Sequence, residues 1–94
     1  MAIQSFRCGD TEKLWLRSAC HATFRPFGAV AMRKLAMLNR AGALNDLRIP
    51  PGNQLEALKD DRKGQHSIRI NKQWRVCFIW TKDGPTNVEI VDYH

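Results

Sequence analysis

The C-terminal part of the chain carries the side chains whose chemical types are most useful together. Lys59 lies in a charged run, Arg75 follows a tryptophan, and the last three residues are Asp92, Tyr93 and His94. Histidine has the side chain whose ordinary pKa lies nearest neutrality, so it exchanges protons readily in the cell. Lysine and arginine bring positive charge, and the planar fork of arginine bonds two phosphate oxygens at once. The set therefore combines proton transfer with stabilisation of negative charge.

These residue types suit the cleavage of an RNA phosphodiester without a metal ion. RNA carries its own nucleophile, the 2′-hydroxyl, next to the scissile phosphate. The protein then has to supply a proton acceptor, a proton donor for the leaving 5′-oxygen and cations against the crowded phosphate. Lys59, Arg75, Asp92 and His94 are the right types for these tasks. Each also has a simpler interpretation, as a solvated edge residue, a surface charge or a partner in an ion pair.

Other kinds of site are less well supported by the spacing of residues. The three cysteines, Cys8, Cys20 and Cys77, are far apart, and neither CxxC nor HxxxH occurs, which disfavours a zinc site or a disulfide framework. No GxSxG elbow or catalytic cysteine signature accompanies them. The sequence therefore predicts no metal and no cofactor, with free thiols in a reducing cytoplasm.

The charge balance indicates what kind of partner the chain binds. Fifteen Lys and Arg against nine Asp and Glu give a net charge of +6 in 94 residues, which favours a polyanionic partner. Charge alone does not distinguish RNA, DNA, a lipid surface and an acidic protein. No apolar run approaches the ~20 residues that cross a membrane, and no export leader is visible. We therefore expect one cytoplasmic domain over residues 1–94.

The N-terminal half is predicted to be mainly helical. Asp10 and Thr11 suit the N-cap of a short first helix. Residues 29–44 form the clearest helical pattern, since their apolar side chains recur every three or four positions. The segment IPPGN at 49–53 then ends helical structure, because proline and glycine disfavour it. A short strand is expected before both helices, at residues 2–6.

The C-terminal half is predicted to be a meander of three or four antiparallel strands joined by polar turns. The clearest strand is 74–80, whose alternation places large apolar side chains on one face and Arg75 and Cys77 on the other. Helices packed on the apolar face give an α+β fold. Polar side chains from neighbouring strands could then converge on the other face to form a site.

Several motifs of the C-terminal half occur together in one protein family. They are L-x-x-L-K-x-x-R-x-G, SIRIN-x-QWR, CF-x-W and the terminal VEIVDYH, and they span Leu55 to His94. In this combination the sequence resembles the plasmid-maintenance killer proteins, the HigB-like branch of the RelE/ParE toxin superfamily. The helix containing RKLAML and the segment PPGN extend the resemblance toward the N-terminus.

The resemblance implies a compact RelE-type fold, in which a short N-terminal strand and two helices pack on an antiparallel meander of three to four strands. It also implies the toxin of a type II toxin–antitoxin system, an endoribonuclease that cleaves mRNA in the A site of the 70S ribosome and so inhibits translation and growth. The expected partner is a cognate HigA-like antitoxin with a helix-turn-helix, through which the pair contacts operator DNA and represses its own operon.

The site residues of that family fall on particular positions of this chain. The lysine after the leucine pair is Lys59, the arginine after the tryptophan is Arg75, and the terminal aspartate and histidine are Asp92 and His94. We expect the two cations to stabilise the phosphorane-like charge, His94 to be the general acid, and Asp92 to orient it or to act as base. Where some relatives have a histidine this chain has Glu56, which makes Glu56 another candidate for the general base.

Contacts to RNA are expected from further basic and aromatic side chains, whereas His66 is expected to be peripheral. The expected RNA contacts are Arg62, Lys63, Arg69, Lys72 and Tyr93. A non-enzymatic interpretation stays open, because a basic module that binds RNA or the ribosome, or that serves only as corepressor of its antitoxin, needs the same cations. No helix-turn-helix signature supports an independent transcription factor.

Overall fold

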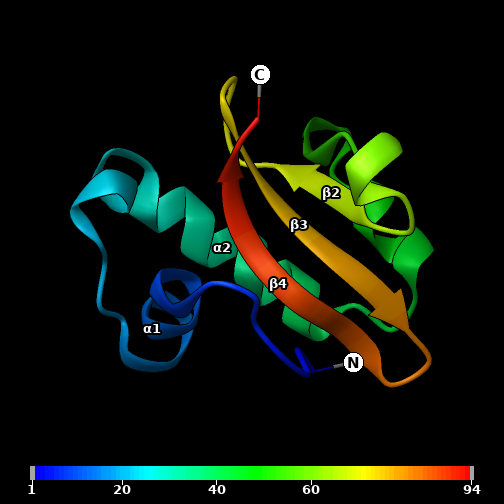
Figure 1. Ribbon diagram of the computed structural model, residues 1–94, viewed down its shortest axis with the longest axis horizontal. Helices are drawn as coiled ribbons and strands as arrows, with labels where there is room; N and C mark the ends of the chain where they lie inside the picture. The colour runs from blue at the N-terminus through cyan, green and yellow to red at the C-terminus, as the bar shows by residue number, and fades with distance from the viewer. Residues whose placement is uncertain (1, 94) are drawn as a thin grey trace.

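A four-stranded antiparallel sheet lies against two α-helices in the computed structural model, which describes residues 2–93 (Figure 1). The strands follow one another in chain order as a meander, and this confirms the predicted α+β class. The helices are α1 Gly9–Arg17 and α2 Gly28–Arg40. The strands are β1 Glu56–Ala57, β2 His66–Arg69, β3 Trp74–Thr81 and β4 Gly84–Asp92.

Short 3₁₀ turns fill most of the connections between these elements. The turn η1 leads directly into α2, η2 and η3 join α2 to β1, and η4 lies between β1 and β2. The predicted end of helical structure at 49–53 is confirmed, since the prolines there leave only a single short turn. The bounds of the turns are η1 Ala22–Phe27, η2 Leu44–Arg48, η3 Pro51–Asn53 and η4 Asp60–Arg62.

The hydrophobic core lies between α2 and one face of the sheet. Ala31, Leu35 and Leu38 are fully buried and recur at the spacing that places them on one side of a helix. They belong to one cluster with Val76 and Phe78 of β3, whose neighbours Trp74 and Trp80 pack against it. The predicted alternation of β3, with these large side chains on the helix-covered face, is confirmed.

The N-terminal segment runs beside β4 and pairs with it only briefly. The predicted strand at 2–6 is reduced to a single parallel bridge between Phe6 and Val88, with a hydrogen bond from Val88 N to Ser5 O at 3.1 Å. The predicted N-cap at Asp10 or Thr11 is wrong, because α1 begins at Gly9. Thr11 is instead buried, and its Oγ1 accepts a hydrogen bond from Ile90 N at 3.0 Å.

A bulge interrupts the pairing of β3 with β4. Cys77 pairs with Glu89 but Ile79 pairs with Thr86, so two residues of β4 lie opposite one residue of β3. The extra residue is Asn87, whose φ of 51° is left-handed and suits asparagine better than most side chains. The bulge shifts the alternation of β4 by one position.

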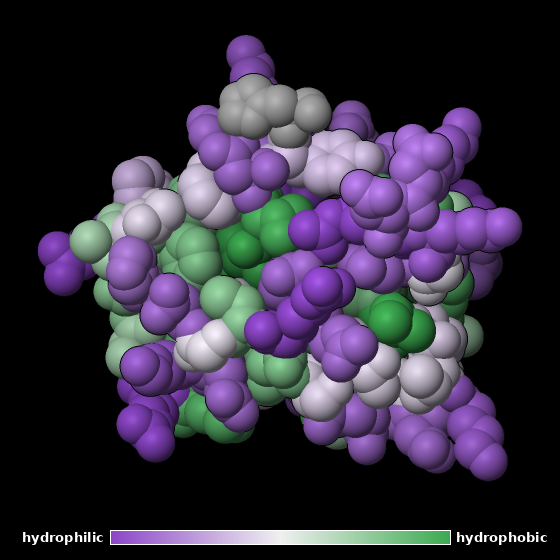
Figure 2. Space-filling model, in the orientation of Figure 1, coloured by the Kyte–Doolittle hydropathy of each residue, from purple (hydrophilic) through white to green (hydrophobic). Residues whose placement is uncertain are grey.

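The sheet face turned away from the helices is largely polar. In Figure 1 the sheet lies in front of α2, so the view in Figure 2 is of this other face, and hydrophilic side chains cover most of it, with small hydrophobic areas between them. Within residues 2–93, neither α-helix has the length and apolar character that a bilayer-crossing segment needs.

Candidate functional site

A row of polar side chains crosses the whole sheet on the face away from the helices. Glu56 lies opposite Ser67, Ser67 opposite Cys77, and Cys77 opposite Glu89. Directly opposed residues of antiparallel strands project to the same side of a sheet. In the next row, Arg69 of β2 lies opposite Arg75, which lies opposite Val91. The polar face therefore holds an arginine, Arg75, in the row next to a carboxylate, Glu56.

Arg75 is the most firmly placed cation on this face. It is only 7% exposed, its Nε donates to Ser67 Oγ at 2.6 Å, and its Nη2 donates to Gln54 O at 2.5 Å. Glu56 Oε1 lies 3.9 Å from Nε, and the Tyr93 ring centroid lies 5.9 Å from Cζ, within cation–π range. Nη1 makes no hydrogen bond to any group of residues 2–93, so its two N–H donors are available to a ligand.

Lys59 lies on the loop that joins β1 to β2. Its side chain is exposed and it immediately precedes η4. The loop is fastened to the sheet by Arg62, whose Nη1 lies 2.8 Å from Glu89 Oε1 and 3.1 Å from Gln65 Oε1. The hydrogen bond to Glu89 raises the pKa of Arg62. The guanidinium of Arg62, expected from the sequence to contact RNA, is thus paired inside the protein.

The end of β4 places its polar residues on different sides. Asp92 lies opposite Trp74, on the face that carries the core, and its Oδ2 accepts a hydrogen bond from Gln73 Nε2 at 2.9 Å. Tyr93 is 38% exposed beside Arg75. His94, the expected general acid, lies outside the described residues. The structure therefore groups Arg75 with Glu56 and Tyr93, and it places Asp92 on the opposite face at the end of the strand.

The other expected RNA contacts lie at the surface. Lys63 and Lys72 are exposed, and Arg69 is half-buried with its Nε donating to Asn71 O at 3.0 Å. The ring of His66 stacks on Phe78 with centroids 6.4 Å apart, so it belongs to the helix-covered face. That placement separates His66 from the polar face that carries Arg75.

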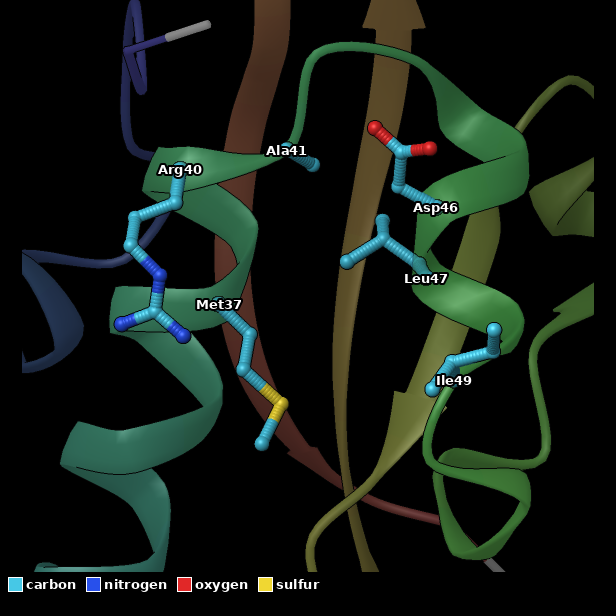
Figure 3. Close-up of a pocket in the computed structure, with 6 residues that line it drawn as sticks. All are labelled: Met37, Arg40, Ala41, Asp46, Leu47 and Ile49. Atoms are coloured by element: carbon cyan, nitrogen blue, oxygen red, sulfur yellow. The ribbon is translucent and has the colours of Figure 1, made fainter.

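Two clefts open on the surface of the described residues. The first, of about 220 Å³, opens between the end of α2 and η2 (Figure 3), and it contains none of the side chains expected to act on RNA. The second, of about 280 Å³, lies beside β1 and includes both Glu56 and His66. Among the described residues, no three His, Cys, Asp or Glu side chains are grouped as metal ligands.

Two residues that hold Arg75 in place could not be identified from the types of their side chains alone. Ser67 and the carbonyl of Gln54 hold the Arg75 guanidinium, but neither is charged. Ser67 alternates with the buried isoleucine of β2, so its face can be deduced from the pattern. The role of a backbone carbonyl leaves no comparable signal in the sequence.

The thiol of Cys77 lies beneath the ion pair of Arg62 with Glu89 and should be inert. Cys77 is fully buried, and burial raises the pKa of its thiol to about 11. The thiolate is the reactive form, so native protein at pH 8 should be modified by a thiol reagent at Cys8 and Cys20 but not at Cys77. The measurement is peptide mass mapping after alkylation, with and without denaturant. Rapid native labelling of Cys77 would contradict the burial.

The raised pKa of Cys77 also predicts how stability depends on pH. Since the folded pKa lies above the ordinary thiol value of ~8.5, the folded state favours the protonated thiol. This contribution is fully present below about pH 8.5 and is lost as pH rises through about 11. Replacing Cys77 by alanine should therefore flatten the fall in melting temperature over that range, relative to Cys8→Ala.

Comparison with known proteins gives the family. Residues 5–94 match the family described as RelE-like toxin of the type II toxin–antitoxin system HigB. The chain is 50% identical over 62 residues to Toxin HigB-1 of Vibrio cholerae serotype O1. The matched segment covers 66% of this chain and 64% of that protein. It is 39% identical over 59 residues to an uncharacterized protein of Haemophilus influenzae, covering 63% and 58% respectively. The chain spans less than two thirds of the length of each relative. The chain belongs to the HigB-like toxin family.

Proposed function

We propose that this HigB-like toxin is an endoribonuclease that cleaves mRNA in the ribosomal A site and so inhibits translation and growth. The observation that carries the proposal is the buried guanidinium of Arg75, fixed by Ser67 and Gln54. Its Nη1 makes no hydrogen bond within residues 2–93, and Glu56 and Tyr93 lie beside the guanidinium. An arginine held in this way is ready to bond the oxygens of a phosphate without reorganising.

In the proposed reaction the 2′-hydroxyl attacks the adjacent phosphorus. The bond from phosphorus to the 2′-oxygen forms as the bond to the 5′-oxygen breaks, leaving a 2′,3′-cyclic phosphate and a 5′-hydroxyl. A base takes the proton of the nucleophile, and an acid protonates the leaving oxygen. No metal is needed, because the nucleophile belongs to the substrate.

The residues of this chain divide these tasks. Arg75 and Lys59 stabilise the negative charge that develops on the phosphate, and His94 donates the proton to the leaving oxygen. Glu56 is half-exposed and lies 3.9 Å from Arg75 Nε, whereas Asp92 lies on the opposite face of the sheet. This placement favours Glu56 over Asp92 as the base. Tyr93 offers a ring on which a base of the RNA can stack.

The partners follow from the same proposal. The family name includes an antitoxin, and we propose a HigA-like protein that neutralises this chain and links it to operator DNA. The mRNA substrate is presented by the 70S ribosome in the cytoplasm. Exposed basic residues such as Lys63 and Lys72 would then face the phosphates of mRNA or ribosomal RNA.

The proposal is tested by translating a defined mRNA with purified ribosomes and the purified toxin. Primer extension should reveal new 5′ ends within codons of the translated region, and none when ribosomes are omitted. Inhibition of translation without new ends would contradict cleavage and favour the alternative, a basic module that only binds RNA or the ribosome.

A further inference from the structure

The segment IPPGN, which the proposed chemistry does not use, ends in a fully buried asparagine. Asn53 is 0% exposed, and both ends of its amide are bonded. Its Oδ1 accepts a hydrogen bond from Lys34 Nζ at 2.6 Å, and its Nδ2 donates to Leu47 O at 3.2 Å and approaches Ile49 O at 3.5 Å. Asn53 therefore joins α2, η2 and the turn η3 at one point.

Asn53 contacts residues that lie on both sides of the cleft shown in Figure 3. Met37 projects from α2 toward Leu47 and Ile49, which lie across the cleft on and after η2. Asn53 Nδ2 also lies 3.7 Å from Met37 Sδ. The amide thus bridges the helix and the turn that precedes β1, and it holds the spacing between them.

The residue that follows Asn53 has a left-handed backbone. Gln54 has φ 45° and ψ 54°, and its N–H donates to Pro51 O at 3.0 Å. A residue other than glycine in this region is uncommon and persists where the surrounding structure fixes it. This conformation aims the Gln54 carbonyl at Arg75 Nη2. The orientation of Arg75 therefore depends on a turn whose conformation is fixed by Asn53.

Lys34 supports Asn53 from α2. Desolvation by burial, and then the charge of neighbouring Arg33, lowers the pKa of Lys34. Its ammonium donates a hydrogen bond to the buried side-chain amide of Asn53, so this cation contacts a group inside the protein. Arg33, by contrast, is exposed on the same helix. The two adjacent cations therefore have different environments, which makes them a matched pair for a test.

We infer that Asn53, held by Lys34, is a positioning residue for Arg75, and that this series of contacts fixes the guanidinium in the orientation that RNA cleavage needs. The inference rests on the proposed function. Nε and Nη2 of Arg75 are bonded within the protein, so a rotation of the Gln54 carbonyl turns the whole planar fork. A misplacement of about 1 Å at a reacting group can cost ~100-fold in rate.

The first test compares Lys34→Met with Arg33→Met, which removes the same charge from the adjacent exposed position. Single-turnover cleavage on purified ribosomes gives the maximal rate and the half-saturating concentration separately. Lys34→Met should lower the maximal rate by about 10- to 100-fold at unchanged half-saturation, while Arg33→Met leaves the maximal rate unchanged. Equal effects of the two substitutions, or an effect confined to half-saturation, would mean that Lys34 is a plain cation and would overturn the inference.

A second readout does not depend on activity. The Arg75 Nε–H is bonded to Ser67 Oγ, so its NMR signal should exchange slowly with solvent in the wild type and in Arg33→Met. Lys34→Met and Asn53→Ala should both accelerate this exchange. If the wild type cleaves no RNA, the proposed function fails, yet the exchange rates still decide whether Asn53 positions Arg75. Unchanged exchange in folded Lys34→Met protein overturns the inference even where Asn53→Ala does not fold.

Discussion

Replacing Arg75 by alanine is expected to lower the maximal rate of mRNA cleavage by roughly 100- to 1,000-fold, the usual cost of losing a preorganised donor to developing negative charge. The physical reason is that the guanidinium is already fixed by Ser67 and Gln54, while Nη1, which has no hydrogen-bond partner among residues 2–93, is directed to the phosphate in the proposed reaction. Arg75→Lys should recover only part of the loss, because an ammonium keeps the charge but not the planar fork. The measurement is single-turnover cleavage with the toxin in excess over mRNA-programmed ribosomes.

The matched control for this experiment is Arg25→Ala, which removes an exposed arginine from η1. It carries the same change in net charge, so it separates a general electrostatic effect from the loss of Arg75 itself. Circular dichroism and a thermal melt establish that each variant is folded. Arg75→Ala protein that is folded and cleaves as fast as Arg25→Ala would remove Arg75 from the reaction.

Phe78→Ala is expected to destabilise the fold by about 3–5 kcal/mol, the usual cost of deleting a buried aromatic ring. Phe78 is fully buried in the cluster between the sheet and α2, and its ring also stacks on His66. For a domain of this size each kcal/mol corresponds to ~4–8 °C in melting temperature. Urea denaturation followed by tryptophan fluorescence gives the change in the free energy of unfolding.

The control lies at the next position of the same strand. Ile79 projects from the other face of β3 and is only partly buried, so Ile79→Ala should lose clearly less stability than Phe78→Ala. Comparable losses for both substitutions would mean that the two faces of β3 are packed alike, and this would contradict the assignment of a single core.

The fold was largely predictable because one face of the sheet is packed and the other is polar. A strand with that environment must alternate, and the pattern from Trp74 to Trp80 therefore predicted both the strand and its faces. The apolar stripe of α2 was equally informative, as was the break at IPPGN. These signals are local, so they can be recognised without knowledge of the tertiary structure.

Features that depend on distant contacts were not predictable. The segment at 2–6 forms only one bridge with β4, and its backbone hydrogen bonds go to Pro85 and Val88, near the other end of the chain. Thr11 suited an N-cap by type, yet its hydroxyl bonds to Ile90, 79 positions away. A prediction from local propensity does not take such a distant partner into account.

The same limit applies to the candidate site. The types of Lys59, Arg75 and Glu56 could be chosen from the sequence, but not which of the cations is already paired. Arg62 is bonded to Glu89, 27 positions along the chain, while Arg75 is fixed by a carbonyl that any residue could supply. The alternation of residues predicted the polar face of the sheet. Only the three-dimensional contacts distinguish Arg62, which is paired with Glu89, from Arg75, whose Nη1 makes no hydrogen bond within residues 2–93.

The bulge of β4 also bears on how the length of this strand can vary among related chains. When a regular strand loses one residue, every side chain on one side of the deletion moves to the opposite face of the sheet. Loss of Asn87 would instead turn the two-against-one pairing into a regular ladder, with Thr86 still opposite Ile79 and Glu89 still opposite Cys77. One-residue gaps in alignments of HigB-like sequences are therefore expected at this position, where they leave the partner of Arg62 in place.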